Sequence, residues 1–358
     1  MNITFLIGNG FDRNLGLETT YSDFVKEYKK TNGSTETLKE FRAYIKDNEE
    51  LWSTAEVALG EYTGQFGDGE AEAFSECHAD FCEHLATYLK EQESQIDYDS
   101  ARVKIEKAFS RVNKITQVFP MQEREIIDGV YSSHASETRT FNFLCYNYTG
   151  TLDKCIEIAK QNPDVLGAHR YGGSNLGHGI GQICHVHGTV DKEMVFGVND
   201  DTQIAKPEVF VCEDGDIYKN LLVKKTANAS YLENTDGRAA KILDNSNIIY
   251  IYSMSIGMTD KLWWERVCNW LAGSDSRHLI VQKYSMPSKD AFPVKYQLAE
   301  RKARREISQY CNLDAKKKVA IENRIHITSE NIFESIKDIG KTTKVSNDEI
   351  EEISAVVR

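Results

Sequence analysis

Short apolar runs recur along the chain and predict the strands of a buried β-sheet. Most of these runs are continuously apolar instead of alternating with polar residues, which is typical of parallel strands covered on both faces. Parallel strands need helical crossovers, and the patterns of Leu152–Lys160 and Lys261–Leu271 can supply two of them. The runs that we interpret as strands are Ile3–Ile7, Thr140–Tyr146, Ile183–Val186, Glu193–Val198, Ile248–Ser253, His278–Gln282 and, as a further candidate, Ile325–Thr328.

The interval between the first two strands has a helical pattern. From about Tyr21 to Ser136 it is rich in Glu, Lys, Ala, Leu and aromatic residues and contains only one proline, Pro120. Apolar residues recur at helical spacing from Phe74 to Leu89, so we expect an all-helical insertion packed beside the sheet. The predicted fold class is α/β, with a Rossmann-like parallel sheet and a large all-helical insertion after the first strand.

These patterns divide the chain into three parts. Residues 1–20 and 137–335 form a discontinuous nucleotide-binding domain, residues 21–136 the helical insertion, and residues 336–358 a charged C-terminal tail. Within the first part, a glycine-rich loop between Asp164 and Gln182 is long enough to suggest a function. In the tail, Ile350, Ile353 and Val356 form an amphipathic stretch that could dock on the body of the protein or on a partner.

Composition excludes several classes of protein. The 358 residues carry a formal net charge of −12, which argues against nucleic acid as a partner because phosphate binding needs concentrated Lys and Arg. No signal-peptide pattern follows Met1, and runs such as Asn247–Met254 are too short to span a bilayer. The eight cysteines are irregularly spaced and form no CxxC pair, so a reduced, cytoplasmic protein is the simplest interpretation.

The segment after the first strand carries the first candidate binding motif. The strand leads directly into Gly8-Asn9-Gly10-Phe11-Asp12, which predicts a glycine-bearing turn and the start of a helix. Glycine lets a ligand approach the main chain closely, and such a turn beside a helix start is typical of a nucleotide phosphate site. The alternative is a tight turn without a ligand.

Three further polar motifs stand at the ends of predicted strands. Asn147-Tyr148-Thr149 ends the second strand, His185-Val186-His187 lies on the third, and Ser253-Met254-Ser255 ends a later one, followed by Asp260. Asn147, Thr259 or Asp260 could instead cap helices, and both histidines could be packed core residues. Because parallel strands end at one edge of a sheet, we expect the four motifs to meet in one crevice.

The histidine pair has two interpretations. Alternation puts His185 and His187 on the same face of the strand, but metal binding needs a third ligand, and no strong pattern supplies one. We therefore expect no metal. His187, which precedes a glycine at the strand end, is better placed to face a cleft as a general base.

These motifs resemble those of the AbiH family of bacteriophage abortive-infection proteins. The resemblance rests on LIGNGFDRNLGLETTYSDF, FNFLCYNYTGTLD, HVHGTV with the following VFGVND, and SMSIGMTD, in this order over roughly residues 4–260. AbiH proteins in turn look like distant relatives of the sirtuin-type, NAD-binding Rossmann-like fold. The resemblance therefore implies a sirtuin-type sheet with NAD as substrate or ligand.

Carried over to this chain, the sirtuin pattern matches some positions and not others. Gly8 and Gly10 match the glycine turn at the dinucleotide phosphates, Asn147 the asparagine beside the nicotinamide ribose, and His187 the catalytic histidine. Ser253-Met254-Ser255 matches the stretch that meets the adenosine side, although AbiH proteins usually have Gly-His-Ser-Leu-Gly there. Val25 replaces an arginine after Asp23-Phe24, Thr149 stands where sirtuins have an acid, and no four-cysteine zinc module is present, which argues against protein deacetylation.

The resulting expectation is a cytoplasmic antiphage effector that hydrolyses NAD. Asn147 would position a water or a ribose hydroxyl, His187 would take its proton, and Asp12 or Asp153 would stabilise the developing cation. The residues expected to bind the nucleotide are Gly8, Asn9, Gly10, Phe11, Asp12, Tyr21, Phe24, Tyr148, Thr149, Ser253, Ser255 and Asp260.

Two alternatives keep the same crevice. In the first, the protein is a non-catalytic nucleotide sensor in which binding moves the helical insertion to control a partner. In the second, it is a metal-dependent nuclease that uses Asp12, His185 and His187. The partners expected besides the nucleotide are a second copy of the chain or another protein of a defence system.

Overall fold

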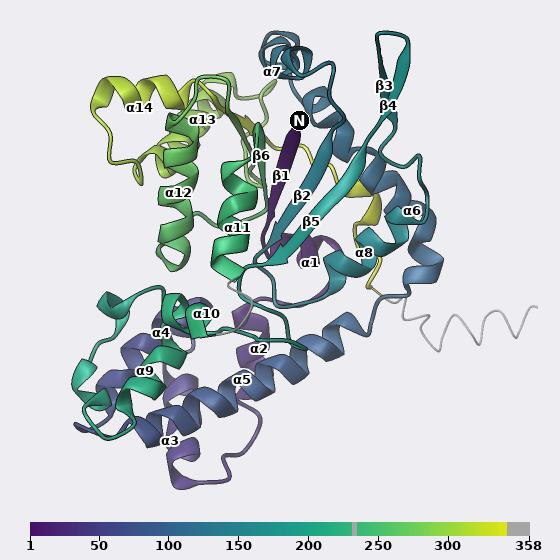
Figure 1. The fold of residues 1–358 in the computed structure, drawn as a ribbon. Coiled ribbons are helices and arrows are strands. Elements are labelled where there is room, and N and C mark those ends of the chain that lie inside the picture. The colour runs from purple at the N-terminus through teal and green to yellow at the C-terminus, as the bar shows by residue number, and fades with distance from the viewer. Residues whose placement is uncertain (231–234, 342–358) are drawn as a thin grey trace, which may run out of the picture.

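The computed structural model describes residues 1–230 and 235–341, so the Ile350–Val356 stretch of the predicted tail lies outside the described residues. Its centre is a six-stranded sheet with the order β5-β2-β1-β6-β7-β8 (Figure 1), in which every neighbouring pair is parallel. The strands are β1 (Asn2–Ile7), β2 (Thr140–Cys145), β5 (Gly179–His185), β6 (Ile248–Tyr252), β7 (His278–Gln282) and β8 (Ile325–Thr328). The predicted parallel α/β sheet is confirmed.

Helices cover both faces of this sheet, which explains the continuously apolar strands. In β1, Ile3, Phe5 and Ile7 face one hydrophobic core, while Leu6 faces the other. The first core is closed by α6 (Tyr98–Ser110), α7 (Met121–Ser133) and α8 (Thr151–Lys160). The second is closed by α11 (Thr235–Asp244), α12 (Lys261–Ala272), α13 (Pro293–Ser308) and α14 (Ala315–Glu322). The predicted crossover helices are present as α8 and α12.

A second body of helices lies at the carboxyl edge of the sheet, and we call it the helical body (Figure 1). The predicted helical insertion supplies α2 (Tyr21–Tyr28), α3 (Glu36–Asp47), α4 (Ala55–Tyr62) and α5 (Ala71–Glu93). A later excursion adds α9 (Gly215–Leu222) and α10 (Lys224–Ser230). These segments have a separate, aromatic-rich core, whereas α6 and α7 of the insertion pack on the sheet.

One predicted strand is wrong. Glu193–Val198 does not join the sheet, and the pairing near it is limited to isolated bridges between Thr189 and Lys192 and between Val198 and Val223. Phe196 and Val198 are buried in the core of the helical body. The apolar character of the segment therefore reflects packing against helices and not pairing with a strand.

The predicted glycine-rich loop between Asp164 and Gln182 contains regular structure. Most of it forms an antiparallel hairpin of β3 (Ala168–Tyr171) and β4 (Ser174–Gly177), with Gly172 and Gly173 at positive φ in the two-residue turn. The hairpin extends from the end of the sheet that is opposite to the helical body (Figure 1). It is therefore remote from the edge where the strand-end motifs meet.

The cysteines depart from the expected reduced state at one pair. Cys268 of α12 and Cys311, which follows α13, form a disulfide with a Cα–Cα distance of 5.3 Å. The other six cysteines are free thiols. Within the described ranges, no helix combines the length and the apolar character needed to cross a bilayer.

The strand order determines where a ligand can enter. Counted along the main sheet, the order is 3-2-1-4-5-6, and the direction of winding reverses between β1 and β6. In open α/β sheets, the loops at such a reversal separate and leave a crevice beyond the carboxyl ends of the strands. β1 ends before the glycine turn and β6 ends before Ser253, so both motifs stand at this point.

Candidate functional site

A cavity of about 690 Å³ lies between the carboxyl edge of the sheet and the helical body. Its volume is within the range usual for small-molecule sites. The cavity is lined by Gly8, Asn9, Gly10, Asp12, Arg13, Thr19, Thr20, Tyr21, Glu56, Leu85, Leu89, Tyr146, Asn147, Tyr148, Thr149, His187, Lys224, Ser253, Met254, Ser255, Thr259, Asp260 and Tyr284. The four strand-end motifs thus contribute to one cavity.

The glycine turn brings β1 and β6 together at the floor of the cavity. The N–H groups of Gly8 and Gly10 donate to the main-chain oxygens of Tyr252 and Ser253 at 3.1 and 3.2 Å. A Cβ atom on Gly10 would lie 1.8 Å from Oγ of Ser253. The residue must therefore be glycine because the end of β6 approaches so closely, and these two N–H groups are already donated within the protein.

Asn147 lines the cavity and carries a buried side-chain amide without a hydrogen-bond partner among the described residues. The residue is only 6% exposed, and within the described structure neither Oδ1 nor Nδ2 has a hydrogen-bond partner. A buried polar group without a partner costs about 1–3 kcal/mol. A polar ligand in the cavity would remove this cost.

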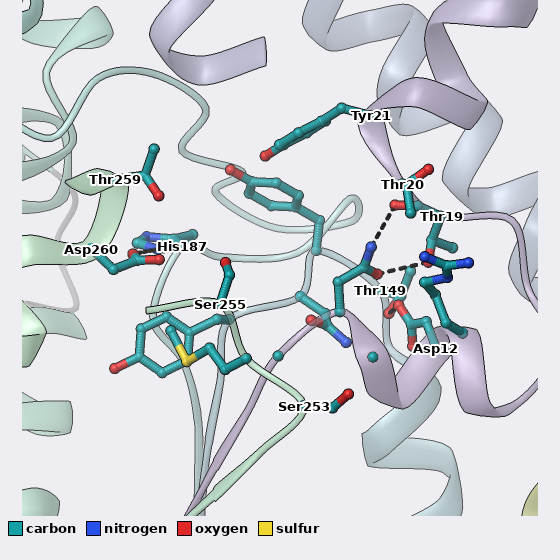
Figure 2. Close-up of a pocket in the computed structure, with 18 of the residues that line it drawn as sticks. Asp12, Thr19, Thr20, Tyr21, Thr149, His187, Ser253, Ser255, Thr259 and Asp260 are labelled. Carbon is teal, nitrogen blue, oxygen red and sulfur yellow. Dashed lines mark hydrogen bonds and ion pairs between the residues drawn. The ribbon is translucent and has the colours of Figure 1, made fainter. Parts of the chain in front are cut away.

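His187 and Asp260 form a hydrogen-bonded pair at one end of the cavity (Figure 2). The Nε2 atom of His187 lies 3.0 Å from Oδ1 of Asp260, and Nδ1 has no partner among the described residues. Although burial raises the pKa of Asp260, the Lys224 ammonium and the hydrogen bond from His187 together lower it below the ordinary value. An ionised Asp260 accepts from Nε2–H, which leaves the lone pair of neutral His187 on Nδ1.

A buried ion pair that sequence reasoning missed lies in the wall formed by the helical body. Glu56 of α4 accepts hydrogen bonds from Nζ of Lys224 at 2.8 Å and from the hydroxyls of Tyr21 and Tyr148 at 2.9 and 3.1 Å. Burial lowers the pKa of Lys224, but the Glu56 and Asp260 carboxylates outweigh this effect and raise it. The Lys224 ammonium therefore keeps its proton inside the cavity wall.

Asp12 and Thr149 meet at the other end of the cavity (Figure 2). Asp12 is 1% exposed and accepts hydrogen bonds from the hydroxyls of Thr149 and Thr151. Burial raises the pKa of Asp12 to about 6, against the lowering effect of the two hydroxyls. Position 149 lacks the acid of the sirtuin pattern, but its hydroxyl holds the carboxylate of Asp12 at 2.6 Å.

Two predicted binding residues lie outside the cavity. Phe11 is fully buried and packs edge-on against Phe333 of the sheet core. Phe24 is buried in the helical body against Phe81. Both belong to motifs that reach the cavity, but their side chains are apolar and point into hydrophobic cores.

His185 does not share the surroundings of His187, because β5 ends at His185 and the alternation stops there. The Nε2 atom of His185 lies 2.6 Å from Oδ2 of Asp153 on α8. Neither residue lines the cavity, whereas Asp12, the other carboxylate expected to stabilise the cation, does. Asp12, His185 and His187 each have different partners, and the described residues contain no group of three or more His, Cys, Asp or Glu that could hold a metal. The nuclease hypothesis therefore has no assembled ligand set in this part of the chain.

Comparison with known families shows which family the chain belongs to. The sequence model of the family described as Bacteriophage abortive infection AbiH matches residues 4–282. This chain belongs to the AbiH family. No curated protein and no solved structure matches it.

The AbiH match extends from β1 to the last residue of β7. It therefore includes the glycine turn, the Asn147 and His187 motifs, the end of β6 and both segments that supply Glu56 and Lys224. Family membership makes this AbiH protein an abortive-infection protein that acts against bacteriophage.

Proposed function

We propose that this AbiH protein binds NAD in the cavity and hydrolyses the bond between nicotinamide and ribose. One observation carries the proposal. The Asn147 side-chain amide, which has no partner in the described part of the chain, and the His187–Asp260 pair belong to residues that line the same cavity, at the reversal of strand order. Dinucleotides bind at this point of doubly wound sheets. The sirtuin-like pattern of Gly8, Asn147 and His187 gives further support.

The chemistry assigns a role to each residue. Asn147 orients a water or a ribose hydroxyl with its free amide, and His187 accepts the proton on Nδ1. Water adds to C1′ of the ribose, the C1′–N bond breaks, and its electron pair neutralises the nicotinamide nitrogen. The products are nicotinamide, ADP-ribose and one proton, which His187 takes from the water.

Two effects would accelerate the proposed hydrolysis of NAD: stabilisation of the positive charge on the ribose and positioning of the general base. The transition state carries positive charge on the ribose, and the carboxylates of Asp12 and Asp260 in the cavity wall would stabilise it. A positioned general base contributes about 10²–10⁴-fold. Loss of NAD from an infected cell would stop phage replication, which agrees with abortive infection.

The test is incubation of the purified chain with NAD while nicotinamide and ADP-ribose are measured over time. We expect His187→Ala and Asn147→Ala to lose activity by about 10²-fold or more with the fold retained. His84→Ala is the matched control, since His84 is partly exposed on α5 and does not line the cavity. Unchanged rates in both cavity variants would remove the proposed roles.

A second candidate function is that of a non-catalytic nucleotide sensor. It is favoured by the position of the cavity, because Tyr21 and Glu56 come from the helical body while Asn147 and His187 come from the sheet. A ligand would contact both bodies. Thermal stabilisation by NAD without turnover would support this function, since a ligand at 100 times its dissociation constant adds about 2.7 kcal/mol to the free energy of unfolding.

A further inference from the structure

The first histidine of the His-Val-His motif has no part in the proposed reaction, yet its surroundings are specific. His185 is the last residue of β5 and pairs in register with Cys145 of β2. Its imidazole is 13% exposed and lies between Asp153 of α8 and the main chain of Asn147. It therefore contacts the main chain of a residue that lines the cavity and has a side-chain amide without a partner in the described structure.

Both ring nitrogens of His185 face acceptor oxygens. Nε2 lies 2.6 Å from Oδ2 of Asp153, and Nδ1 lies 3.2 Å from the main-chain oxygen of Asn147. A neutral imidazole has a single N–H, so one of these contacts would oppose a nitrogen lone pair to an oxygen lone pair. An imidazolium donates in both directions and satisfies both oxygens. The geometry therefore fits the charged form.

The charged groups around the ring agree with this assignment. Burial lowers the pKa of His185, but the neighbouring Cys145 sulfur and the Asp153 carboxylate outweigh burial and raise it to about 11.

We propose that His185 is a positioning residue, a lasting imidazolium that links Asp153 to the main-chain oxygen of Asn147 and so fixes the position of Asn147 in the cavity wall. The two histidines of the motif then differ in their partners: His185 lies between two acceptor oxygens, and His187 faces one. The consequence for NAD rests on the proposed function, whereas the charge of His185 does not.

The experiment uses the full chain labelled with ¹⁵N-histidine and ¹⁵N-asparagine, and three variants of α8. Asp153→Asn removes the anion, Asp153→Glu keeps it, and Glu157→Gln is the control, because it removes one exposed carboxylate from the same helix. Asp153 is 37% exposed, so its replacement leaves the core intact. Imidazole nitrogen shifts are recorded between about pH 6 and pH 9, the range in which an ordinary histidine loses its proton.

We expect both nitrogens of His185 to remain protonated over this range in the wild type, in Asp153→Glu and in Glu157→Gln. In Asp153→Asn we expect His185 to lose a proton within the range and the side-chain amide signals of Asn147 to move with it. A wild-type His185 that is neutral at about pH 8 would overturn the assigned charge. Asn147 signals that stay in place while His185 titrates in Asp153→Asn would overturn the positioning role.

A calorimetric measurement of NAD affinity separates this inference from the proposed function. We expect Asp153→Asn to bind NAD about tenfold more weakly above the pH at which His185 is deprotonated, and the other chains to show no such loss. If NAD binds none of the chains while the NMR results hold, the proposed function fails and the inference stands. If NAD binds Asp153→Asn equally well at both pH values, the positioning role is wrong.

Discussion

Asp260 follows β6 and His187 follows β5, yet Oδ1 of Asp260 and Nε2 of His187 are 3.0 Å apart. These strands are separated in the sheet by β2 and β1. The contact therefore depends on loops that cross the carboxyl edge, and it closes one end of the cavity. Its consequence is chemical, because the partner of Nε2 decides which nitrogen of His187 can accept a proton.

Asp260→Asn should remove this control while keeping the size of the side chain. The amide can donate to Nε2, which favours the tautomer with the proton on Nδ1 and blocks the base. We expect NAD hydrolysis to fall by about 10²–10⁴-fold while the fold is retained. Product release and circular dichroism measure the two effects, with Asp99→Asn on exposed α6 surface as the control. Equal rates in both variants would refute the role of Asp260.

Gly10→Ala should destabilise the protein. The new Cβ would lie 2.3 Å from Cβ and 2.9 Å from the main-chain oxygen of Ser253, so the segment after β6 must shift, at a cost of about 1–3 kcal/mol. Gly129→Ala in α7 is the matched control, because no atom lies within 4 Å of its Cβ, and it should stabilise by about 0.5–1 kcal/mol. Urea unfolding gives both values, and a loss shared by the two variants would contradict the explanation.

Lys224→Met should cost about 3–5 kcal/mol, because it leaves the Glu56 carboxylate buried without its cation. The double variant with Glu56→Gln should cost less than the sum of the two single variants. Lys219→Met on neighbouring α9 removes an ion pair that is 32% and 64% exposed, and it should change stability by less than about 1 kcal/mol. Strict additivity in the urea-derived cycle would show that Glu56 and Lys224 are not coupled.

Asp12 should make the protein lose stability as pH rises. Its native pKa of about 6 exceeds the ordinary 3.8, so the folded chain binds a proton more tightly than the unfolded chain. The stabilisation by protonated Asp12 is complete below about pH 4 and is lost by about pH 6, with a difference of about 3 kcal/mol. In Asp12→Asn this component should vanish. Urea midpoints at several pH values test it, and an identical pH dependence in both proteins would count against it.

Much of the fold could be predicted because the apolar pattern of a strand matches its burial in the folded sheet. The continuously apolar residues of β1 and β6 are buried on both faces, and the predicted convergence brings Gly8, Asn147, His187 and Ser253 to one cavity. The errors arise where burial has another cause. Residues 193–198 are apolar because they pack against helices.

The charged wall of the cavity could not be predicted from local sequence. Glu56 lies on a helix among apolar residues, and Lys224 lies in a polar excursion, 168 residues further on. Nothing near either residue indicates a partner. Only the packing of the excursion against the insertion joins them.

The sheet supplies one side of the cavity, and two separate chain segments inserted after β1 and β5 supply the other. Both segments lie in connections between strands of the sheet, so their sequences can diverge without altering strand pairing. Related proteins could therefore keep the same floor, built from the strand ends, while exchanging the helical body above it, and so come to recognise different molecules during infection.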